Sequence, residues 1–107
     1  MKYVGKYSPW GQIDHSESPS EGVHFVSTPG HGGIKLEASV NKLVPETLRT
    51  KGGWYEEDCE YAIAVCALPY KFSLTNVKYA VKSMRRWYPE EWEYLKALRK
   101  YNKIVSK

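Results

Sequence analysis

The sequence has no apolar run that approaches the 18 or so residues of a membrane-spanning helix. Its first segment, MKYVGKYSPWGQID, has no apolar stretch followed by a small-residue cleavage site, so we expect no secretory leader. Cysteine is scarce: only Cys59 and Cys66 occur, and they form no CxxC pattern of the zinc-binding kind. The three histidines form no HxH or HxxxH pair. These absences predict a cytoplasmic protein without a membrane span, a metal site built on histidines alone or a cofactor.

The composition that is present is that of one folded domain. The chain has 107 residues, of which 42% are hydrophobic and 26% charged, values close to those of ordinary folded proteins. The aromatic residues are nine Tyr, four Trp and only two Phe. Most of the rings therefore carry a polar group, which suits half-buried positions and contact surfaces. Within a single domain, 1–107, we expect a partly mobile N-terminal strand and loop (1–22), a motif-bearing region (23–68) and a basic helical region (71–107).

Charge is distributed unevenly along the chain. Residues 1–70 contain six Lys or Arg against nine Asp or Glu, whereas residues 71–107 contain ten against three. This asymmetry predicts an acidic face and a basic face, and the basic face would attract phosphate, acidic protein or another anionic surface.

The N-terminal half has the patterns of strands. Apolar and polar side chains alternate weakly along residues 2–13, which predicts one strand. The polar segment 14–22 predicts a loop. Residues 23–28, VHFVST, give the clearest strand, and residues 34–37, IKLE, give a second one. The connection PGHGG favours a hairpin between the two strands, although a loop ordered around a ligand fits the same residues.

The C-terminal half has helical spacing. Residues 38–48 predict two short helical pieces separated by Pro45, and residues 54–68 predict one helix that contains both cysteines. Their Cα atoms would then lie about 10 Å apart, which excludes a disulfide. Ser73 or Thr75 can cap a third helix, and Pro89 opens a last one. The inward positions of these two helices are expected to be Leu74, Val77, Val81, Met84, Trp87 or Tyr88, and Trp92, Leu95 and Leu98. The fold class is therefore α+β, a small antiparallel sheet covered by about three helices.

Two segments suggest more than a structural role: VSTPGHGGIKL at residues 26–36 and GGWYEEDCEYA at residues 52–62. Together they resemble the signature of an uncharacterised domain family found in phage and other mobile-element proteins and in some larger bacterial proteins. The resemblance extends from about residue 23 to residue 68. It implies a mobile-genetic-element setting and no particular mechanism.

His31 lies among glycines, where the backbone can adopt positive φ and the imidazole is uncrowded. One hypothesis pairs His31 as a general base with Glu57 or Asp58, which with Glu56 would occupy the first turn of a helix, in a hydrolytic or metal site. The structural alternative is a tight turn beside acids that stabilise the helix dipole. Phosphate binding at this loop is a weaker alternative, with Lys35 nearby. The loop residues in question are Gly30, His31, Gly32 and Gly33.

The basic C-terminal region interleaves cations with aromatic rings, a surface that can neutralise phosphates and stack bases. The alternative is an ordinary solvated helix face. The candidate binding residues are Lys78, Lys82, Arg85, Arg86, Arg99 and Lys103, with Trp87 and Tyr88 as anchors.

The leading functional hypothesis is a small phage or mobile-element binding protein. It would contact a host protein or an anionic ligand, either a nucleic acid or a nucleotide, through the basic aromatic face, and would thereby counter a host defence. The alternatives are a small hydrolase or transferase that uses His31 with Glu57 or Asp58, and an assembly module that forms a homodimer through its Trp-rich helices.

Overall fold

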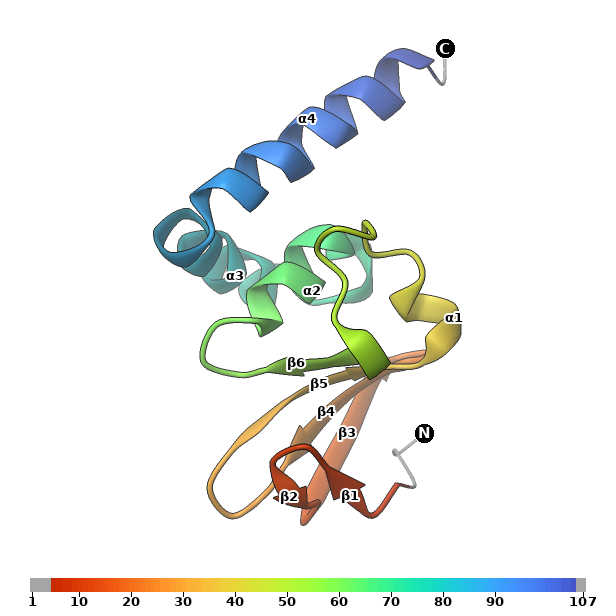
Figure 1. The fold of residues 1–107 in the computed structure, drawn as a ribbon, viewed down its shortest axis with the longest axis vertical. Helices are drawn as coiled ribbons and strands as arrows, with labels where there is room; N and C mark the ends of the chain where they lie inside the picture. Colours follow the sequence, from red (N-terminus) through yellow and green to blue (C-terminus); the bar gives the residue numbers. More distant parts are fainter. Residues whose placement is uncertain (1–4, 106–107) are drawn as a thin grey trace.

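A four-stranded antiparallel sheet lies below the helices, in the orientation of Figure 1, in a computed structural model that describes residues 5–105. Its strand order is β3-β4-β5-β6, so each strand pairs with its neighbour in the sequence. The strands are β3 (His15–Ser20), β4 (Val23–Ser27), β5 (Gly32–Leu36) and β6 (Trp54–Glu56). The predicted hairpin between residues 23–28 and 34–37 is confirmed as β4 and β5.

Helices cover one face of this sheet, and a two-stranded hairpin lies on the other side (Figure 1). The hairpin strands are β1 (Tyr7–Ser8) and β2 (Gly11–Gln12), which replace the single strand expected over residues 2–13; residues 2–4 lie outside the described part. The helices are α1 (Ala38–Asn41), α2 (Tyr61–Ala67), α3 (Leu74–Trp87) and α4 (Pro89–Val105), with 3-10 turns η1 (Lys51–Gly53) and η2 (Pro69–Lys71). The predicted α+β class is confirmed.

The core forms where α2 lies between the sheet and α3. All five central residues of α2, from Ala62 to Cys66, are buried. Ile34 and Leu36 from β5 and Met84 from α3 complete this layer and are almost fully buried. Because α2 is rich in alanine, its neighbours can approach its backbone closely.

Most of the polar segment 14–22 is a strand, His15–Ser20, and not the predicted loop. β3 pairs with β4 from His15 opposite Ser27 to Ser20 opposite Val23, and the register shifts between Glu17 and Ser20. An edge strand tolerates Pro19 at such an irregularity because one side of its backbone needs no partner. Pairing with the apolar β4 therefore outweighs the poor strand propensity of β3.

The helix predicted over residues 54–68 is wrong in its first half. Residues 54–56 form β6 against β5, and α2 begins only at Tyr61. Glu56 therefore ends a strand, and Glu57 and Asp58 lie in the turn that follows, so none of the three is in a first helical turn. Cys59 accordingly precedes the helix that holds Cys66, and both thiols are free. Of the two helical pieces expected around Pro45, only α1 is a helix.

The last two helices begin as predicted. The Ser73 hydroxyl accepts a hydrogen bond of 3.1 Å from the backbone N–H of Asn76 and caps α3, and Pro89 is the first residue of α4. One expected inward position is wrong, because Leu74 is 69% exposed. Of the alternatives Trp87 and Tyr88, it is Tyr88 that packs against the core, whereas Trp87 is 55% exposed. The first half of α4 packs on the body through Leu95, and its far half projects away (Figure 1). Among the described residues, no helix has the length and apolar character needed to cross a membrane.

Candidate functional site

Three side chains from the two motif segments meet at one end of the sheet. Ligand atoms of His31, Glu56 and Asp58 all lie within 4.8 Å of one another. His31 and Asp58 are exposed, and Glu56 is half-buried. We call these three residues the His31 cluster. The structure thus brings His31 and Asp58 together, as the sequence suggested, but the third member is Glu56 and not Glu57.

The register of the β5–β6 pair builds this cluster. Gly33 lies opposite Glu56, and the N–H of Glu57 donates to the carbonyl of Gly32 over 2.9 Å, so the same antiparallel register continues beyond β6. Asp58 follows in the turn after β6, and its carboxylate lies within 4.8 Å of the ligand atoms of His31 and Glu56. Because side chains alternate between the two faces of a sheet, His31, Glu56 and Asp58 share a face, and Glu57 belongs to the other.

The backbone on both sides of the cluster is held by hydrogen bonds. Thr28 closes the β4–β5 loop: its N–H donates to the His31 carbonyl over 2.7 Å, and its hydroxyl accepts from the His31 N–H over 3.1 Å. In the turn after β6, the N–H of Asp58 donates to Glu56 Oε1, and the N–H of Glu56 donates to Glu60 Oε1, both over 3.3 Å. The cluster therefore stands on a fixed hairpin end and a fixed turn.

Negative charge is concentrated in this turn. The pKa of Glu56 is raised, chiefly by its side-chain hydrogen bond with Asp58, while the nearby His31 lowers it. Within residues 5–105, no Lys or Arg forms a salt bridge with Glu56, Glu57 or Asp58. The carboxylates are thus close to one another and lack a neutralising cation from the described chain.

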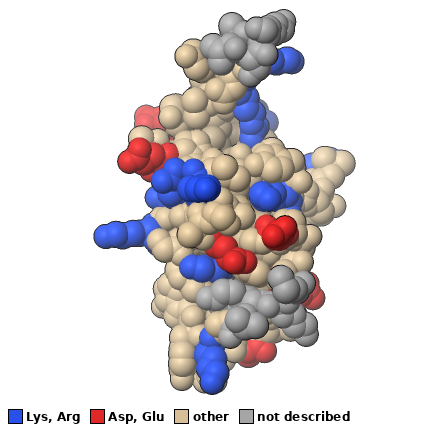
Figure 2. All heavy atoms as spheres, turned by 90° about the vertical axis from the view of Figure 1, so that its right-hand side faces the viewer, with Lys and Arg blue, Asp and Glu red and all other residues tan. Residues whose placement is uncertain are grey.

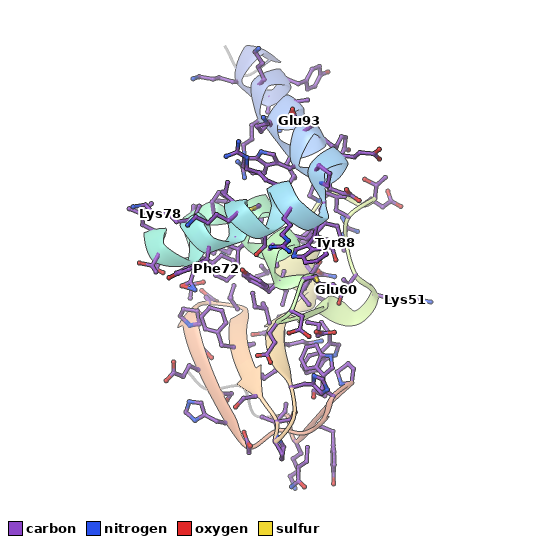
Figure 3. All side chains as sticks on the ribbon, turned by 90° about the vertical axis from the view of Figure 1, so that its left-hand side faces the viewer. Lys51, Glu60, Phe72, Lys78, Tyr88 and Glu93 are labelled. Atoms are coloured by element: carbon purple, nitrogen blue, oxygen red, sulfur yellow. The ribbon has the colours of Figure 1, made fainter. Side chains whose placement is uncertain are left out.

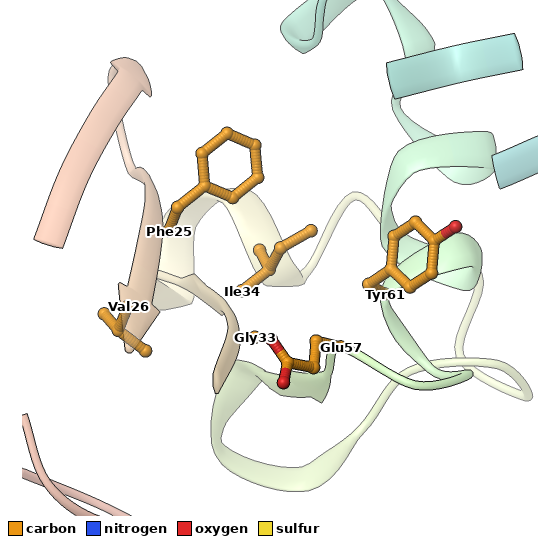
Figure 4. A pocket seen from close by; sticks show the side chains of 6 residues that line it. All are labelled: Phe25, Val26, Gly33, Ile34, Glu57 and Tyr61. Atoms are coloured by element: carbon orange, nitrogen blue, oxygen red, sulfur yellow. The ribbon is translucent and has the colours of Figure 1, made fainter. Parts of the chain in front are cut away.

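Glu57 lies instead beside a hollow of about 280 Å³ on the helical side of the sheet. Phe25 and Ile34 line one part of this hollow and Tyr61 lines another, with the Glu57 carboxylate beside Gly33 (Figure 4). An apolar hollow with one carboxylate could accept a small cationic group, but Glu57 is not a partner for His31 within the His31 cluster.

The glycines of the loop do not adopt a left-handed backbone conformation. Where a glycine is required, the reason is that neighbouring atoms leave no room for a side chain. The glycines with positive φ are Gly11, Gly22, Gly52 and Gly53, so that expectation for Gly30, Gly32 and Gly33 is wrong. A Cβ on Gly33 would lie 2.3 Å from the Tyr55 carbonyl oxygen and 2.6 Å from the Trp10 ring. Lys35, the cation near this loop in the phosphate-binding alternative, donates to the Gly52 carbonyl, and its Nζ lies 4.7 Å from the Trp54 ring centroid.

The second candidate site is the exposed surface of α3. Lys78, Lys82, Arg85 and Arg86 are all exposed, and no carboxylate in the described part of the chain forms a salt bridge with any of them. We call these four residues the α3 basic face. Figure 3 shows Lys78 pointing outward near the start of α3. By contrast, the face drawn in Figure 2 has Lys, Arg, Asp and Glu interspersed.

Two shallow hollows flank the α3 basic face, and each contains a ring. Lys78, Lys82 and Tyr79 line one of about 270 Å³. Arg85 lines the other, of about 300 Å³, together with Trp92 and the ion pair of Lys96 with Glu93. Lys82 and Arg85 are three residues apart and are therefore neighbours on the helix surface, so the two hollows adjoin.

The remaining predicted binding residues have different surroundings. The Arg86 guanidinium lies 4.9 Å from the Trp87 ring centroid, so Trp87 belongs beside the basic face. Tyr88 is half-buried against the core, and burial raises the pKa of its hydroxyl; it points toward Glu60 (Figure 3). Arg99 donates to the carbonyl of Cys66 at the end of α2, and Lys103 is exposed on the projecting half of α4. Tyr88 and Arg99 thus have structural contacts of their own.

A third constellation was not found from the sequence. The buried ring of His24 bonds Ser18 Oγ through Nδ1 (2.6 Å) and Glu37 Oε2 through Nε2 (2.8 Å). An ionised carboxylate only accepts, so the Nε2–H of His24 donates to Glu37, whereas the Ser18 hydroxyl can either donate to or accept from Nδ1. These hydrogen bonds, from Ser18 through His24 to Glu37, join β3, β4 and the residue before α1. Only knowledge that residues 15–20 form a strand beside β4 would have revealed it.

The fold and its sites define a small α+β domain with a mixed histidine and carboxylate cluster and a basic helical face. A family model described as a domain of unknown function (DUF7007) matches residues 3–103, so the chain belongs to this family. The predicted membership of a family without an assigned activity is therefore confirmed. No curated protein and no solved structure matches the chain.

Proposed function

We propose that the chain is a binding protein that captures single-stranded nucleic acid through the α3 basic face. The observation that carries this proposal is the set of four exposed cations on one helix, none of which is paired with an acid among residues 5–105. Unpaired cations on one surface favour a phosphate backbone as the partner, because each contact releases a counterion from the nucleic acid.

The length of the face and its rings favour a single strand. Lys78 and Arg85 are seven residues apart, about 10 Å along the helix axis, so they can contact more than one phosphate of a strand. Tyr79 and Trp87 are exposed beside these cations, and Trp92 is half-buried in the adjoining hollow. Unpaired bases can stack on such rings, with about 1–3 kcal/mol per base.

The biological setting follows from the resemblance of the two motif segments. It favours a phage or another mobile element, with the protein acting in the cytoplasm of the host. A protein of this kind that sequesters a host nucleic acid or nucleotide would counter a defence that depends on that ligand. A host protein with an acidic surface is the competing partner class.

The test is fluorescence anisotropy with a labelled single-stranded oligonucleotide of mixed sequence at several salt concentrations. Four contacts predict that log K falls with log salt with a slope of about −3. The double variant R85E/R86E is expected to abolish binding and to change the free energy of unfolding by less than about 0.5 kcal/mol, as exposed substitutions usually do. The matched control is K6E/K51E, which makes the same change in net charge at two exposed lysines of the sheet half.

Equal binding by R85E/R86E and the wild type would overturn the role of this face. Equal losses in R85E/R86E and K6E/K51E would show that net charge alone drives association. If the oligonucleotide does not bind and a host protein is retained only by the wild type, the partner is that protein and the nucleic-acid proposal is wrong.

A hydrolase or transferase is a second candidate function, favoured by the meeting of His31 with Asp58. In this site Glu56 takes the place that the sequence suggested for Glu57. The imidazole would act as the general base and the carboxylates would orient it. This candidate requires that the His31→Ala variant folds normally and loses turnover of any substrate that the wild type converts.

A further inference from the structure

We propose that His31, Glu56 and Asp58 bind one divalent transition-metal cation of the Zn²⁺ or Co²⁺ class. This inference is independent of nucleic-acid binding, because it uses none of the residues of the α3 basic face. The three donors come from two segments that are distant in sequence: His31 from the end of the β4–β5 loop, and Glu56 and Asp58 from the end of β6 and the turn after it.

The donor set indicates the class of cation. One imidazole nitrogen and two carboxylate oxygens suit first-row transition metals, whereas Mg²⁺ and Ca²⁺ prefer oxygen ligands alone. At metal–ligand bonds of about 2.1 Å, two donors in a tetrahedral site lie roughly 3.4 Å apart. The donors here lie within 4.8 Å, so closure needs side-chain movements on the order of 1 Å, which the two exposed members can make.

The electrostatics of the turn favour a bound cation. Glu56 and Asp58 are adjacent carboxylates, Glu60 accepts a hydrogen bond from the same turn, and no Lys or Arg of the described chain neutralises them. Like charges in contact are costly unless a proton or a cation is shared between them. A metal ion bound to both carboxylates and to His31 would remove that repulsion.

The backbone holds the three donors in register before any ion binds. The β5–β6 ladder places Gly33 opposite Glu56, and the Thr28 hydrogen bonds fix the backbone of His31. Metal binding therefore orders side chains alone and does not require a loop to fold. Three protein ligands also leave at least one coordination position for water or another ligand.

Isothermal titration calorimetry with ZnCl₂ tests this site, supported by the visible absorption of the Co²⁺ form. All proteins carry Cys59→Ser, so that the thiol next to Asp58 contributes no heat or absorption. We expect saturable binding of one ion. His31→Gln and Asp58→Asn should each weaken it by at least about tenfold. The matched controls are Glu57→Gln, a neighbouring carboxylate on the other face, and His15→Gln, another exposed histidine that lies 3.4 Å from a glutamate; both should bind within about twofold of the parent.

Three outcomes would overturn the proposal. The first is the absence of saturable binding by the parent protein. The second is unchanged affinity in His31→Gln, which would place the ion elsewhere. The third is an equal loss in His15→Gln and His31→Gln, which would mean non-specific surface binding. Circular dichroism of each variant before titration verifies that a loss of binding does not come from unfolding.

Discussion

Removal of one hydroxyl group, in the Tyr55→Phe variant, is expected to destabilise the protein by about 2–6 kcal/mol. Tyr55 is fully buried, and its hydroxyl donates to Asn41 Oδ1 over 2.6 Å and accepts from the Thr50 N–H over 3.2 Å. Without the hydroxyl, one buried acceptor and one partly buried donor lose their partner. Each such loss costs about 1–3 kcal/mol. Tyr55 belongs to neither the His31 cluster nor the α3 basic face, and its ring faces the core, so this substitution tests stability alone.

Equilibrium unfolding in urea, followed by Trp fluorescence, measures this loss as a lower midpoint at unchanged slope. The matched control is Tyr101→Phe, because Tyr101 is 62% exposed on the projecting half of α4. This control should change the free energy of unfolding by less than about 0.5 kcal/mol. A loss below about 1 kcal/mol in Tyr55→Phe would refute the reasoning, because the hydrogen bonds to Asn41 and Thr50 would then contribute almost nothing.

Two further predictions test the packing of the core helix α2 and of the residue that directly precedes β6. Burial raises the pKa of the Cys66 thiol from 9.0 to about 11, so the unfolded chain loses this proton first as the pH rises, and stability falls by about 1.4 kcal/mol per pH unit between those values. The stability gap between the wild type and Cys66→Ala in urea should therefore narrow between pH 9 and pH 11; an equal gap at both would contradict this. Gly53 has φ +79°, and its Cβ would lie 2.1 Å from the Leu36 carbonyl oxygen, whereas nothing lies within 4 Å of a Cβ on Gly30. Gly53→Ala should lower the melting temperature by about 10 °C and Gly30→Ala by at most about 3 °C in a thermal melt, and similar shifts would refute the clash.

The parts of the fold that could be predicted from the sequence are those fixed by local signals. The β4–β5 hairpin follows from two β-branched runs around PGHGG, and α3 and α4 follow from helical spacing, a Ser73 cap and Pro89. In each case the residues that determine the element lie inside it or next to it. Neither the order of the strands nor the packing of α2 was needed.

The errors occur where a partner strand decides the conformation. Tyr55 and Cys59 fit a helical stripe with the apolar residues that follow, yet residues 54–56 pair with β5. Gly53 approaches the Leu36 carbonyl closely, as a residue entering a strand pair can. The same holds for β3, whose polar sequence becomes a strand only beside β4. A single sequence does not reveal these distant pairings.

The error over residues 54–60 also explains the error in the candidate site. If residues 54–60 were helical, nothing in the sequence would fix the position of His31 relative to the acidic residues. Glu57 and Asp58 would then be equally good partners for His31. The antiparallel register removes that freedom, because alternate residues must lie on opposite faces. It selects Glu56 and Asp58 for the face of His31 and places Glu57 beside the hollow on the other face.

The same alternation links the stability of the sheet to the proposed cation site. Ile34 and Tyr55 are paired and buried, so the core fixes the register between β5 and β6. A slip by one residue would bury Glu56 in place of Tyr55 and carry both carboxylates of the His31 cluster away from His31. Conversely, an ion held by His31, Glu56 and Asp58 would connect the β4–β5 loop to the turn after β6 and would stabilise only the native register. The core thus selects the three ligands, and the bound ion would in turn reinforce the pairing that positions them.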